Sequence, residues 1–340
     1  MTPPRVAYLV TYPRDVDPSR EAVAQDIAAL RARLPGPLIS ISPPERLRPI
    51  VPERVFGLWA WQRLRALNSR VDAIFVTHGQ PVFFPVLRAL TRPLVYNVVA
   101  DAVGPLRLRH PAPPTLAGVI SASVTQRDRL IATGVRDVTV IPPGIELARF
   151  PQLPELAHAP GERFVLLHAS APWQVADFAR KGIDSLLDAA VVRPDLQLIF
   201  LWRGRLLPEM RARIEARNLH DRVTVVDRRV AIGDYLAVAH AAVLWVTDPS
   251  VVKAYPHSLL EALASGRPVL LSPNLALAAD VAAQGVGVAA PLVAGLDELM
   301  MHYHRYASSA RQAPREQWDR ARWLDQTAAL IARAASSAHP

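Results

Sequence analysis

The residues with the clearest chemical potential lie in one stretch, Lys253–Pro268, with the sequence K-A-Y-P-H-S-L-L-E-A-L-A-S-G-R-P. The apolar run before it predicts a short buried strand, and Pro256 and Gly266 are typical of the first turn and the end of a helix. Backbone amides at the start of such a helix, here those of His257 to Leu259, can hold a phosphate or diphosphate. Glu261 lies about one turn deeper, where its carboxylate can accept hydrogen bonds from a diol such as a ribose.

The spacing of the charged residues in this stretch resembles a known signature. Lys253 and Glu261 lie eight residues apart, Pro256 and Ser258 stand between them, and A-x-A-x-G-x-P follows. The stretch resembles the E-x7-E signature of retaining GT-B glycosyltransferases, the large family of nucleotide-sugar-dependent transferases. Glu261 matches the second acid, and Lys253 stands in place of the first. The resemblance implies that the donor is bound by Tyr255, Pro256, His257, Ser258, Leu259 and Glu261.

Lys253 is the most informative departure from the family pattern. In the family the first acid contacts hydroxyl groups of the donor sugar, so a cation at this position is expected to alter sugar preference. One hypothesis is that the ammonium pairs with a carboxylate or phosphate of the donor or acceptor, as a uronic acid would provide. A second is that neutral sugars are held differently, and a third is that activity has been lost.

A further part of the resemblance follows a strand that we expect at residues 164–168. The segment Arg180–Ala190 matches the pattern K-G-x-x-x-L-L-x-A, which holds the donor diphosphate in the family. The resemblance implies that Lys181 neutralises the leaving diphosphate. The family's arginine soon after the strand has no counterpart, because His168-Ala-Ser170 and an insertion occupy its place. Arg180 is a candidate substitute, although neighbours on a helix point to different faces, and Ser170 is a candidate donor contact.

Other donor contacts are expected where further strands end. Arg229 and Val230 follow a strand predicted at residues 223–226, where related enzymes hold the base through backbone groups, and Arg203 follows another strand. The segment Val119–Phe150 resembles the family's strand, helix and V-I-P-N-G-V-D-x-x-x-F sequence. The resemblance covers most of the chain, but its motifs are specific only from about residue 119 onward.

In the first half of the chain, strand-like and helix-like segments alternate, which predicts a parallel sheet. Polar residues at the carboxyl ends of such strands face the ligand. This rule selects His78, Asp101 and Ser123, and less strongly Gln80 and Asn97. We take His78 and Asp101 as candidate catalytic residues, while a lone histidine is equally often a structural group.

These patterns predict an α/β protein of the GT-B type, with two Rossmann-like, doubly wound parallel-sheet domains facing a cleft. Residues 1–150 are expected to form the acceptor-binding domain, with a C-terminal helix at residues 315–335 packing back onto it. The proline-containing residues 151–161 are expected to be a linker, and residues 162–314 a donor-binding domain.

Composition limits the partners of the chain. Of its 340 residues, 51% are hydrophobic and 20% are charged, as in folded globular proteins. The absence of cysteine excludes disulfides and thiolate metal sites. The net charge of +9 favours anionic partners such as nucleotide diphosphates or acidic lipid surfaces, while no recognition motif points to nucleic acid. No stretch predicts a membrane span or signal peptide, so we expect a cytoplasmic protein.

The segment Arg54–Leu67 interleaves tryptophan, aliphatic and arginine residues. Such a segment suits a helix in a membrane interface, which would allow peripheral contact with an anionic membrane. The alternative, a helix that packs on its own sheet, is the interpretation that we favour.

The predicted function is retaining, metal-independent transfer of a sugar from a nucleotide-diphosphate donor to a glycan, lipid-linked or small-molecule acceptor, in polysaccharide or glycoconjugate biosynthesis. No cofactor is expected beyond the nucleotide sugar, and no paired-Asp motif predicts a metal. The catalytic candidates are Lys181, Glu261, Lys253, His78 and Asp101. A catalytically silent subunit that binds nucleotide or stabilises a partner transferase is the main alternative. A sugar-nucleotide epimerase would need acid–base carboxylates that the sequence does not place.

Overall fold

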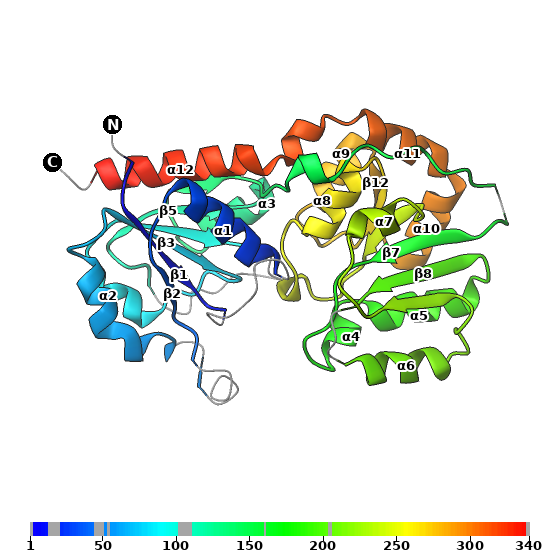
Figure 1. Cartoon of the computed structure of the whole chain (residues 1–340), viewed down its shortest axis with the longest axis horizontal. Coiled ribbons are helices and arrows are strands. Elements are labelled where there is room, and N and C mark those ends of the chain that lie inside the picture. The colour runs from blue at the N-terminus through cyan, green and yellow to red at the C-terminus, as the bar shows by residue number, and fades with distance from the viewer. Residues whose placement is uncertain are drawn as a thin grey trace. The chain divides into compact units, whose positions relative to one another are not determined.

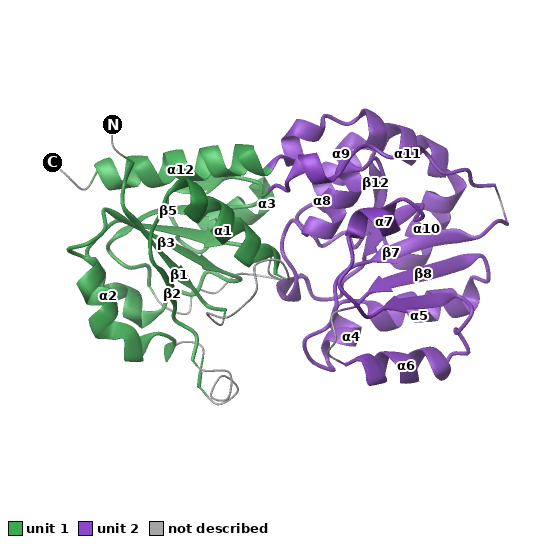
Figure 2. Ribbon diagram, viewed as in Figure 1, with its two compact units in different colours: residues 1–143, 320–340 green, residues 144–319 purple. Residues whose placement is uncertain are grey.

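The computed structural model describes residues 3–12, 21–43, 51–52, 55–100, 111–159, 161–202 and 206–337. The chain forms two compact units, the first Met1–Pro143 with Arg320–Pro340 and the second Gly144–Asp319 (Figures 1 and 2). Each unit contains a six-stranded parallel sheet with helices packed against it, which confirms the predicted α/β fold. The division falls after Pro143, whereas the sequence suggested residue 150.

The first sheet has the strand order β2-β1-β3-β4-β5-β6. Its strands are β1 (Val6–Val10), β2 (Leu38–Ser40), β3 (Ala73–His78), β4 (Leu94–Val98), β5 (Leu116–Ser121) and β6 (Val138–Val140). The helical elements of this unit are α1 (Ala22–Arg33), the 3-10 turn η3 (Leu58–Ala60), α2 (Trp61–Leu67), the 3-10 turn η4 (Pro85–Ala89), α3 (Val124–Ala132) and α12 (Arg320–Ser336).

Strand β3 shows how the first sheet is covered on both faces. Its side chains alternate between the faces because successive residues of a strand point in opposite directions. Ala73 and Phe75 pack in a cluster with residues of α1 and α12, whereas Ile74 and Val76 pack in a second cluster with residues of α2 and η4. The C-terminal helix α12 therefore covers the face that α1 covers, and α2 lies on the other (Figure 1).

The second sheet has the order β12-β11-β10-β7-β8-β9. Its strands are β7 (Phe164–His168), β8 (Leu196–Leu201), β9 (Val223–Val226), β10 (Ala241–Leu244), β11 (Val269–Leu271) and β12 (Gly287–Ala289). The helices are α4 (Asp177–Arg180), α5 (Ile183–Val192), α6 (Leu207–Glu215), α7 (Ile232–Leu236), α8 (His257–Ala264), α9 (Ala278–Gln284), α10 (Leu292–Met301) and α11 (Tyr303–Gln312). Three 3-10 turns complete it, η5 (Leu147–Arg149), η6 (Pro249–Val251) and η7 (Arg315–Trp318).

The segment after η5, which the sequence suggested to be a linker, is bound to the second unit. The Leu153 amide donates to Ser265 O at 3.0 Å, and the guanidinium of Arg267 donates to Pro154 O at 2.7 Å. Arg267 is fully buried, and its other donors are bound by the carbonyls of Leu236 and Ala237. These bonds explain why the boundary between the units lies before this segment.

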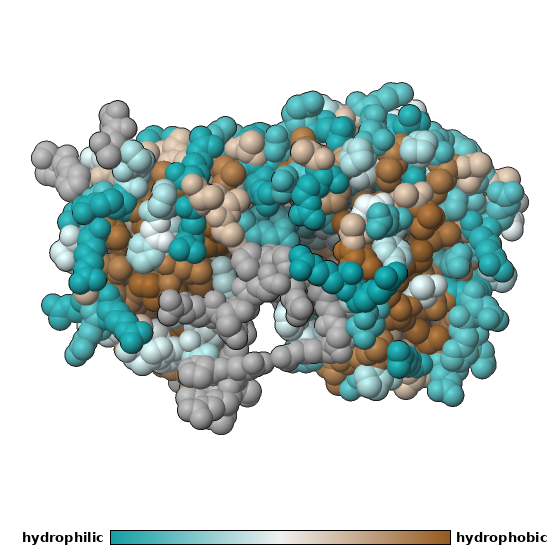
Figure 3. Space-filling model, in the orientation of Figure 1, coloured by the Kyte–Doolittle hydropathy of each residue, from teal (hydrophilic) through white to brown (hydrophobic). Residues whose placement is uncertain are grey.

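The surface is mixed in character. On the face shown in Figure 3, hydrophilic residues border each unit, and hydrophobic residues are visible within each outline. Among the described residues, no helix is long and apolar enough to cross a membrane.

Candidate active site

The second sheet reverses its strand order between β7 and β10, which are paired in parallel. In open α/β sheets, ligands bind where the strands on either side of such a reversal end. The loops that follow β7 and β10 therefore form the part of this unit where a ligand is expected. Lys181 and the residues from Thr247 to Lys253 belong to these two loops and to the short helical elements within them.

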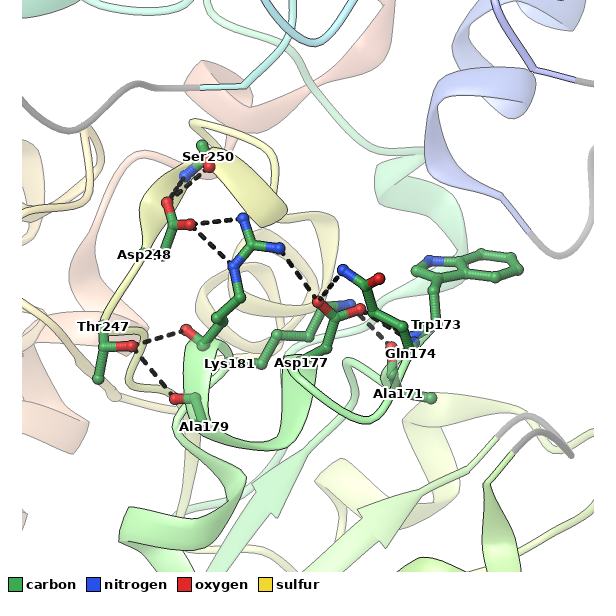
Figure 4. A network of polar contacts seen from close by, with 10 residues as sticks. Ala171, Trp173, Gln174, Asp177, Ala179, Lys181, Thr247, Asp248 and Ser250 are labelled. Atoms are coloured by element: carbon green, nitrogen blue, oxygen red, sulfur yellow. Dashed lines mark hydrogen bonds and ion pairs between the residues drawn. The ribbon is translucent and has the colours of Figure 1, made fainter. Parts of the chain in front are cut away.

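The pair Lys181–Gly182 joins α4 to α5 and is fixed by close packing. Gly182 has φ +67°, and a Cβ atom at this position would lie 1.7 Å from the carbonyl oxygen of Trp245. Only glycine fits there, because both the left-handed backbone and the contact exclude a side chain. Lys181 is 4% exposed, and its Nζ donates to Ala171 O at 2.7 Å (Figure 4). The ammonium is thereby held inside the loop after β7.

Arg180 lies beside Lys181 but points into a different set of contacts, as its helical neighbourhood predicts. Its Nη2 lies 2.6 Å from Asp248 Oδ2, and its Nη1 lies 3.5 Å from Asp177 Oδ1. Burial alone would raise the pKa of Asp248, but hydrogen bonds from Ser250 and Arg180 outweigh this effect and hold the pKa below its ordinary value. The guanidinium is therefore already neutralised within the protein.

The two loops are also joined through their backbones. The Thr247 amide donates to Arg180 O at 3.0 Å, and the Thr247 hydroxyl donates to Ala179 O at 3.2 Å (Figure 4). Asp177, which is 3% exposed, accepts hydrogen bonds from the amides of Trp173 and Gln174. These contacts fix the two loops at the carboxyl ends of β7 and β10.

His168 ends β7 and is 1% exposed. Burial, and secondarily the nearby charge of Lys181, lower its pKa to about 3, so the imidazole is neutral. The Ser170 amide lies 3.4 Å from His168 Nδ1, and Nε2 is a buried atom without a hydrogen-bond partner in the described part of the chain. Ser170 itself is half-buried, directly after the strand.

The helix α8 starts at the loop after β10, as predicted. Its N-cap residue is Pro256, which has no side-chain group that could cap the helix. Lys253 Nζ lies 2.9 Å from His257 Nε2, so the ammonium donates to the imidazole in the first turn. Ser258 is half-buried in the same turn, and Glu261 is half-buried one turn further on.

Two residues predicted to bind the donor near α8 have their groups engaged elsewhere. The hydroxyl of Tyr255 donates to Asp280 of α9, and burial together with this hydrogen bond raises its pKa. The side chain of Leu259 is fully buried, and its amide donates to Pro256 O at 3.1 Å. Of the residues at the start of α8, His257 and Ser258 therefore remain the candidates for binding the donor.

The remaining predicted donor contacts are not gathered around the reversal point. Arg229 and Val230 follow β9, the edge strand, and Arg229 is exposed. Arg203 lies outside the described residues. Within the described residues, no group of three or more His, Asp or Glu side chains could hold a metal ion.

In the first unit, His78 ends β3 and is 7% exposed. Its Nδ1 lies 2.8 Å from Gln80 O, and the Gln80 amide lies 3.1 Å from the same nitrogen. Its ring meets the ring of Phe84 edge to face at 5.2 Å. Ser123 caps α3 by accepting from the Gln126 amide at 3.0 Å. Asp101 lies outside the described residues.

Two acidic residues of the candidate site were not predicted from the sequence, Asp177 and Asp248. Asp248 follows a buried strand within Thr-Asp-Pro-Ser, a sequence typical of a turn in which the aspartate accepts from the amide two residues on. The structure contains this bond, from the Ser250 amide at 2.9 Å. The local signal indicates the turn, but it does not indicate the ion pair with Arg180.

Comparisons with known proteins bear on this geometry. Residues 167–301 match the family model described as glycosyl transferases group 1, and this range includes Lys181, Asp248, Lys253 and Glu261. Among curated proteins, none matches the chain in sequence.

Solved structures share the fold at low sequence identity. HepE of Anabaena, in complex with UDP-glucose, has 17% identity and a TM-score of 0.68, over 98% of this chain and 100% of that chain. Sucrose-phosphate synthase of Thermosynechococcus elongatus has 15% identity and a TM-score of 0.68, over 98% and 100%. WaaG, a glycosyltransferase involved in lipopolysaccharide biosynthesis, has 16% identity and a TM-score of 0.62, over 96% and 99%. The protein therefore has the GT-B fold of these structures, and its residues 167–301 match the model described as glycosyl transferases group 1.

Proposed function

We propose that this protein is a retaining, metal-independent glycosyltransferase that uses a nucleotide-diphosphate sugar to extend a glycan, lipid-linked or small-molecule acceptor, in the biosynthesis of a polysaccharide or glycoconjugate. The observation that carries the proposal is that the loop after β7, which holds Lys181, is joined to the loop after β10 by the bond from the Thr247 amide to Arg180 O, at the reversal point of the second sheet. The bond between the sugar and the diphosphate breaks with negative charge developing on the phosphate. Fixed cations and amides at this point stabilise that charge as it forms.

The use of lysine supports this assignment. Lysine and arginine together number 39, and lysine occurs only at positions 181 and 253, so the other 37 cations are arginines. An ammonium is a compact charge on a flexible stem with three donors, and it fits a position where several acceptors converge. Because Arg180 is already paired with Asp248, we propose that Lys181 and Lys253 supply the positive charge to the donor diphosphate and its sugar.

Each remaining residue has a specific part in the proposed reaction. The first-turn residues His257 and Ser258 bind phosphate oxygens through the start of α8, and Glu261 accepts hydrogen bonds from the ribose. Ser170 contributes a contact from the loop after β7. The first unit binds the acceptor, with His78 and Asp101 as its candidates.

The first test is nucleotide binding and turnover. We expect UDP to bind the purified chain in calorimetry, with GDP and ADP as comparisons, and nucleotide release to be seen with one nucleotide sugar of a panel. The matched control is Arg211→Ala, which removes an exposed arginine of α6 and should leave both measurements unchanged. Absence of binding for all three nucleotides would contradict the proposed donor.

The second test concerns retention and metal. The anomeric proton of the product, observed by nuclear magnetic resonance during the reaction, should have the configuration of the donor sugar. Turnover should be unchanged after EDTA treatment, because the proposed site neutralises the diphosphate with lysines and helix amides. An inverted product, or activity that EDTA abolishes and Mg²⁺ restores, would contradict these two statements.

The third test concerns Lys253. We propose that its ammonium, held by His257, contacts an anionic group of the donor or acceptor. Lys253→Glu should then shift preference from uronic-acid donors to neutral ones within the nucleotide-sugar panel. Equal preference before and after the change would remove this part of the proposal.

A catalytically silent subunit is the second candidate, favoured by the replacement of the first acid of the family pattern by Lys253. It predicts that UDP binds but that no nucleotide sugar is turned over with any acceptor. Lys253→Glu would then separate the two candidates, since restored turnover would show that the lysine alone silences the site.

A further inference from the structure

The proposed reaction leaves one exposed surface of the first unit without a role. We define it as the η3–α2 surface, made by Leu58, Trp59, Trp61, Arg63 and Arg65. Leu58 is 42% exposed, Trp59 53% and Trp61 36%, and both arginines are exposed. Large apolar side chains gathered beside one another on a surface generally mark an interaction site.

The inner side of the same segment explains why these residues stay exposed. Ala60, Leu64 and Leu67 are buried and pack with residues of η4 and of the first sheet. The short helix is thus fixed by its inner residues. Trp59 and Trp61 lie outside the hydrophobic core of the described residues.

Among the described residues of this part of the chain, positive charge predominates. Residues 55–100 contain five arginines and a single acid, Asp72, which pairs with Arg5 at 2.8 Å. Within the described part of the chain, no ion pair engages Arg63, Arg65 or Arg88, and Arg88 belongs to η4, which packs beside α2. In the described part of the chain, the surface therefore combines tryptophan with arginines that no ion pair engages.

We infer that the η3–α2 surface binds an anionic lipid bilayer. Tryptophan is favoured at the boundary between headgroups and acyl chains, and arginine beside it pairs with lipid phosphates. A second copy of the chain would bring the same positive charge against this surface and would be repelled. The inference goes beyond the proposed reaction, because it states where the enzyme works and does not depend on turnover.

The test is co-sedimentation of the full chain with lipid vesicles, without donor or acceptor. Vesicles of phosphatidylcholine alone are compared with vesicles that contain phosphatidylcholine and phosphatidylglycerol in equal parts. We expect binding to the mixed vesicles only, weakening as salt is raised because exposed charges are screened.

Variants assign the binding to these residues. Withdrawal of about 60 Å² of apolar surface from water strengthens binding about tenfold. Trp59→Ala should therefore weaken vesicle binding by about this factor. The double variant Trp59→Ala with Trp61→Ala should weaken it further. Each arginine near an anionic surface contributes about fivefold, so Arg63→Gln with Arg65→Gln should weaken binding about 25-fold. The matched control is Trp173→Ala, which removes a 65% exposed tryptophan of the second unit and should leave vesicle binding unchanged.

The outcomes separate the inference from its rivals. No binding of the native chain to the mixed vesicles, or equal loss with Trp173→Ala, would overturn it. A native dimer in sedimentation velocity that Trp59→Ala dissociates would assign the surface to a second copy and overturn it as well. Melting curves identify any variant that fails to fold, and the arginine variant then decides, because its side chains lie outside the core. Failure of nucleotide binding would leave the vesicle result intact.

Discussion

The carboxyl ends of the two sheets differ in chemistry although both sheets are parallel and doubly wound. At the second sheet, the two loops carry four charged side chains among the described residues, Asp177, Arg180, Lys181 and Asp248. Arg180 pairs with both aspartates, and Lys181 donates to Ala171 O. At the first sheet, the contacts described for three strand-end residues join neutral groups, while the charged residues Asp15 and Asp101, which follow β1 and β4, lie outside the described residues. His78 binds Gln80, the hydroxyl of Tyr96 donates to Val82 O at 2.9 Å, and Asn97 donates to Thr77 at 3.2 Å.

This difference indicates that the topology of a sheet determines where a ligand binds, whereas the loop residues determine which kind of ligand is bound. A charged end suits an anionic ligand, such as a diphosphate, because fixed cations favour it before it arrives. Hydroxyl, amide and imidazole groups, such as those described at the first sheet, suit an uncharged ligand rich in hydroxyls. The division of labour proposed for the two units follows this contrast, and the following changes test it.

The largest effect is expected for Lys181→Met. Loss of a preorganised group that stabilises developing charge typically lowers kcat about 10² to 10³-fold, and we expect a loss in this range. Arg180→Gln is the matched comparison on the neighbouring residue. It should cost less, because the guanidinium is already paired with Asp248. Steady-state kinetics decide, and a larger loss for Arg180→Gln would reverse the roles given to these two residues.

The fold was predictable because its signals are local and periodic. Apolar runs that alternate with helical segments indicate parallel sheets wherever they occur, and Pro256 and Gly266 indicate the limits of α8 within one stretch. The structure has this helix from His257 to Ala264. The Lys181–Gly182 pair was recognisable through the resemblance to the family pattern because its residues are adjacent in the sequence, and the role of Lys181 in donor binding stays a prediction.

The electrostatic partners were not predictable, because they join distant residues. Arg180 and Asp248 are 68 positions apart, and Tyr255 reaches Asp280 on another helix. Such pairs depend on how α4 and α9 pack, which no short-range pattern encodes. The bonds that join Leu153 to Ser265 and Pro154 to Arg267 likewise link residues far apart in the sequence, so their attachment to the second unit could not be predicted from the proline pattern.

The second largest effect is expected in the pH dependence of stability. It is tested by comparing His168, at the end of β7, with His78, at the end of β3. The ordinary pKa of 6.5 applies to His168 in the unfolded chain, whereas burial lowers it to about 3 in the folded one. Between these values the unfolded state binds more protons, so stability rises with pH and is lost as pH falls, by at most about 1.4 kcal/mol per unit. Guanidinium unfolding above and below pH 6.5 measures this slope.

His168→Asn retains an acceptor for the Ser170 amide and removes the titrating ring. We expect the stability of this variant to depend less on pH across the same window. The matching change in the first unit, His78→Asn, serves as the control. An unchanged slope in His168→Asn would show that another group causes the acid sensitivity.

A smaller effect is expected for Asp248→Asn, which removes the charge that holds Arg180. The pair is partly exposed, with side-chain exposures of 36% for Arg180 and 26% for Asp248, so solvent screening limits the loss of stability to about 1 kcal/mol. This corresponds to a fall in Tm of roughly 2–4 °C. Asp72→Asn in the first unit should cost less, because Arg5 is 63% exposed. Calorimetric melting of both variants compares the two ion pairs directly.

The smallest effect is expected for His78→Asn. Asparagine retains an acceptor for the Gln80 amide, while the edge-to-face contact with Phe84, about 0.5–1.5 kcal/mol, is lost. If the first unit binds the acceptor, this change should raise the acceptor KM by no more than about tenfold and leave UDP affinity unchanged. Comparing the acceptor KM with the UDP affinity is informative, because a general loss of stability would impair both. A fall in UDP affinity with an unaltered acceptor KM would place the donor at the neutral sheet end and overturn the contrast between the two units.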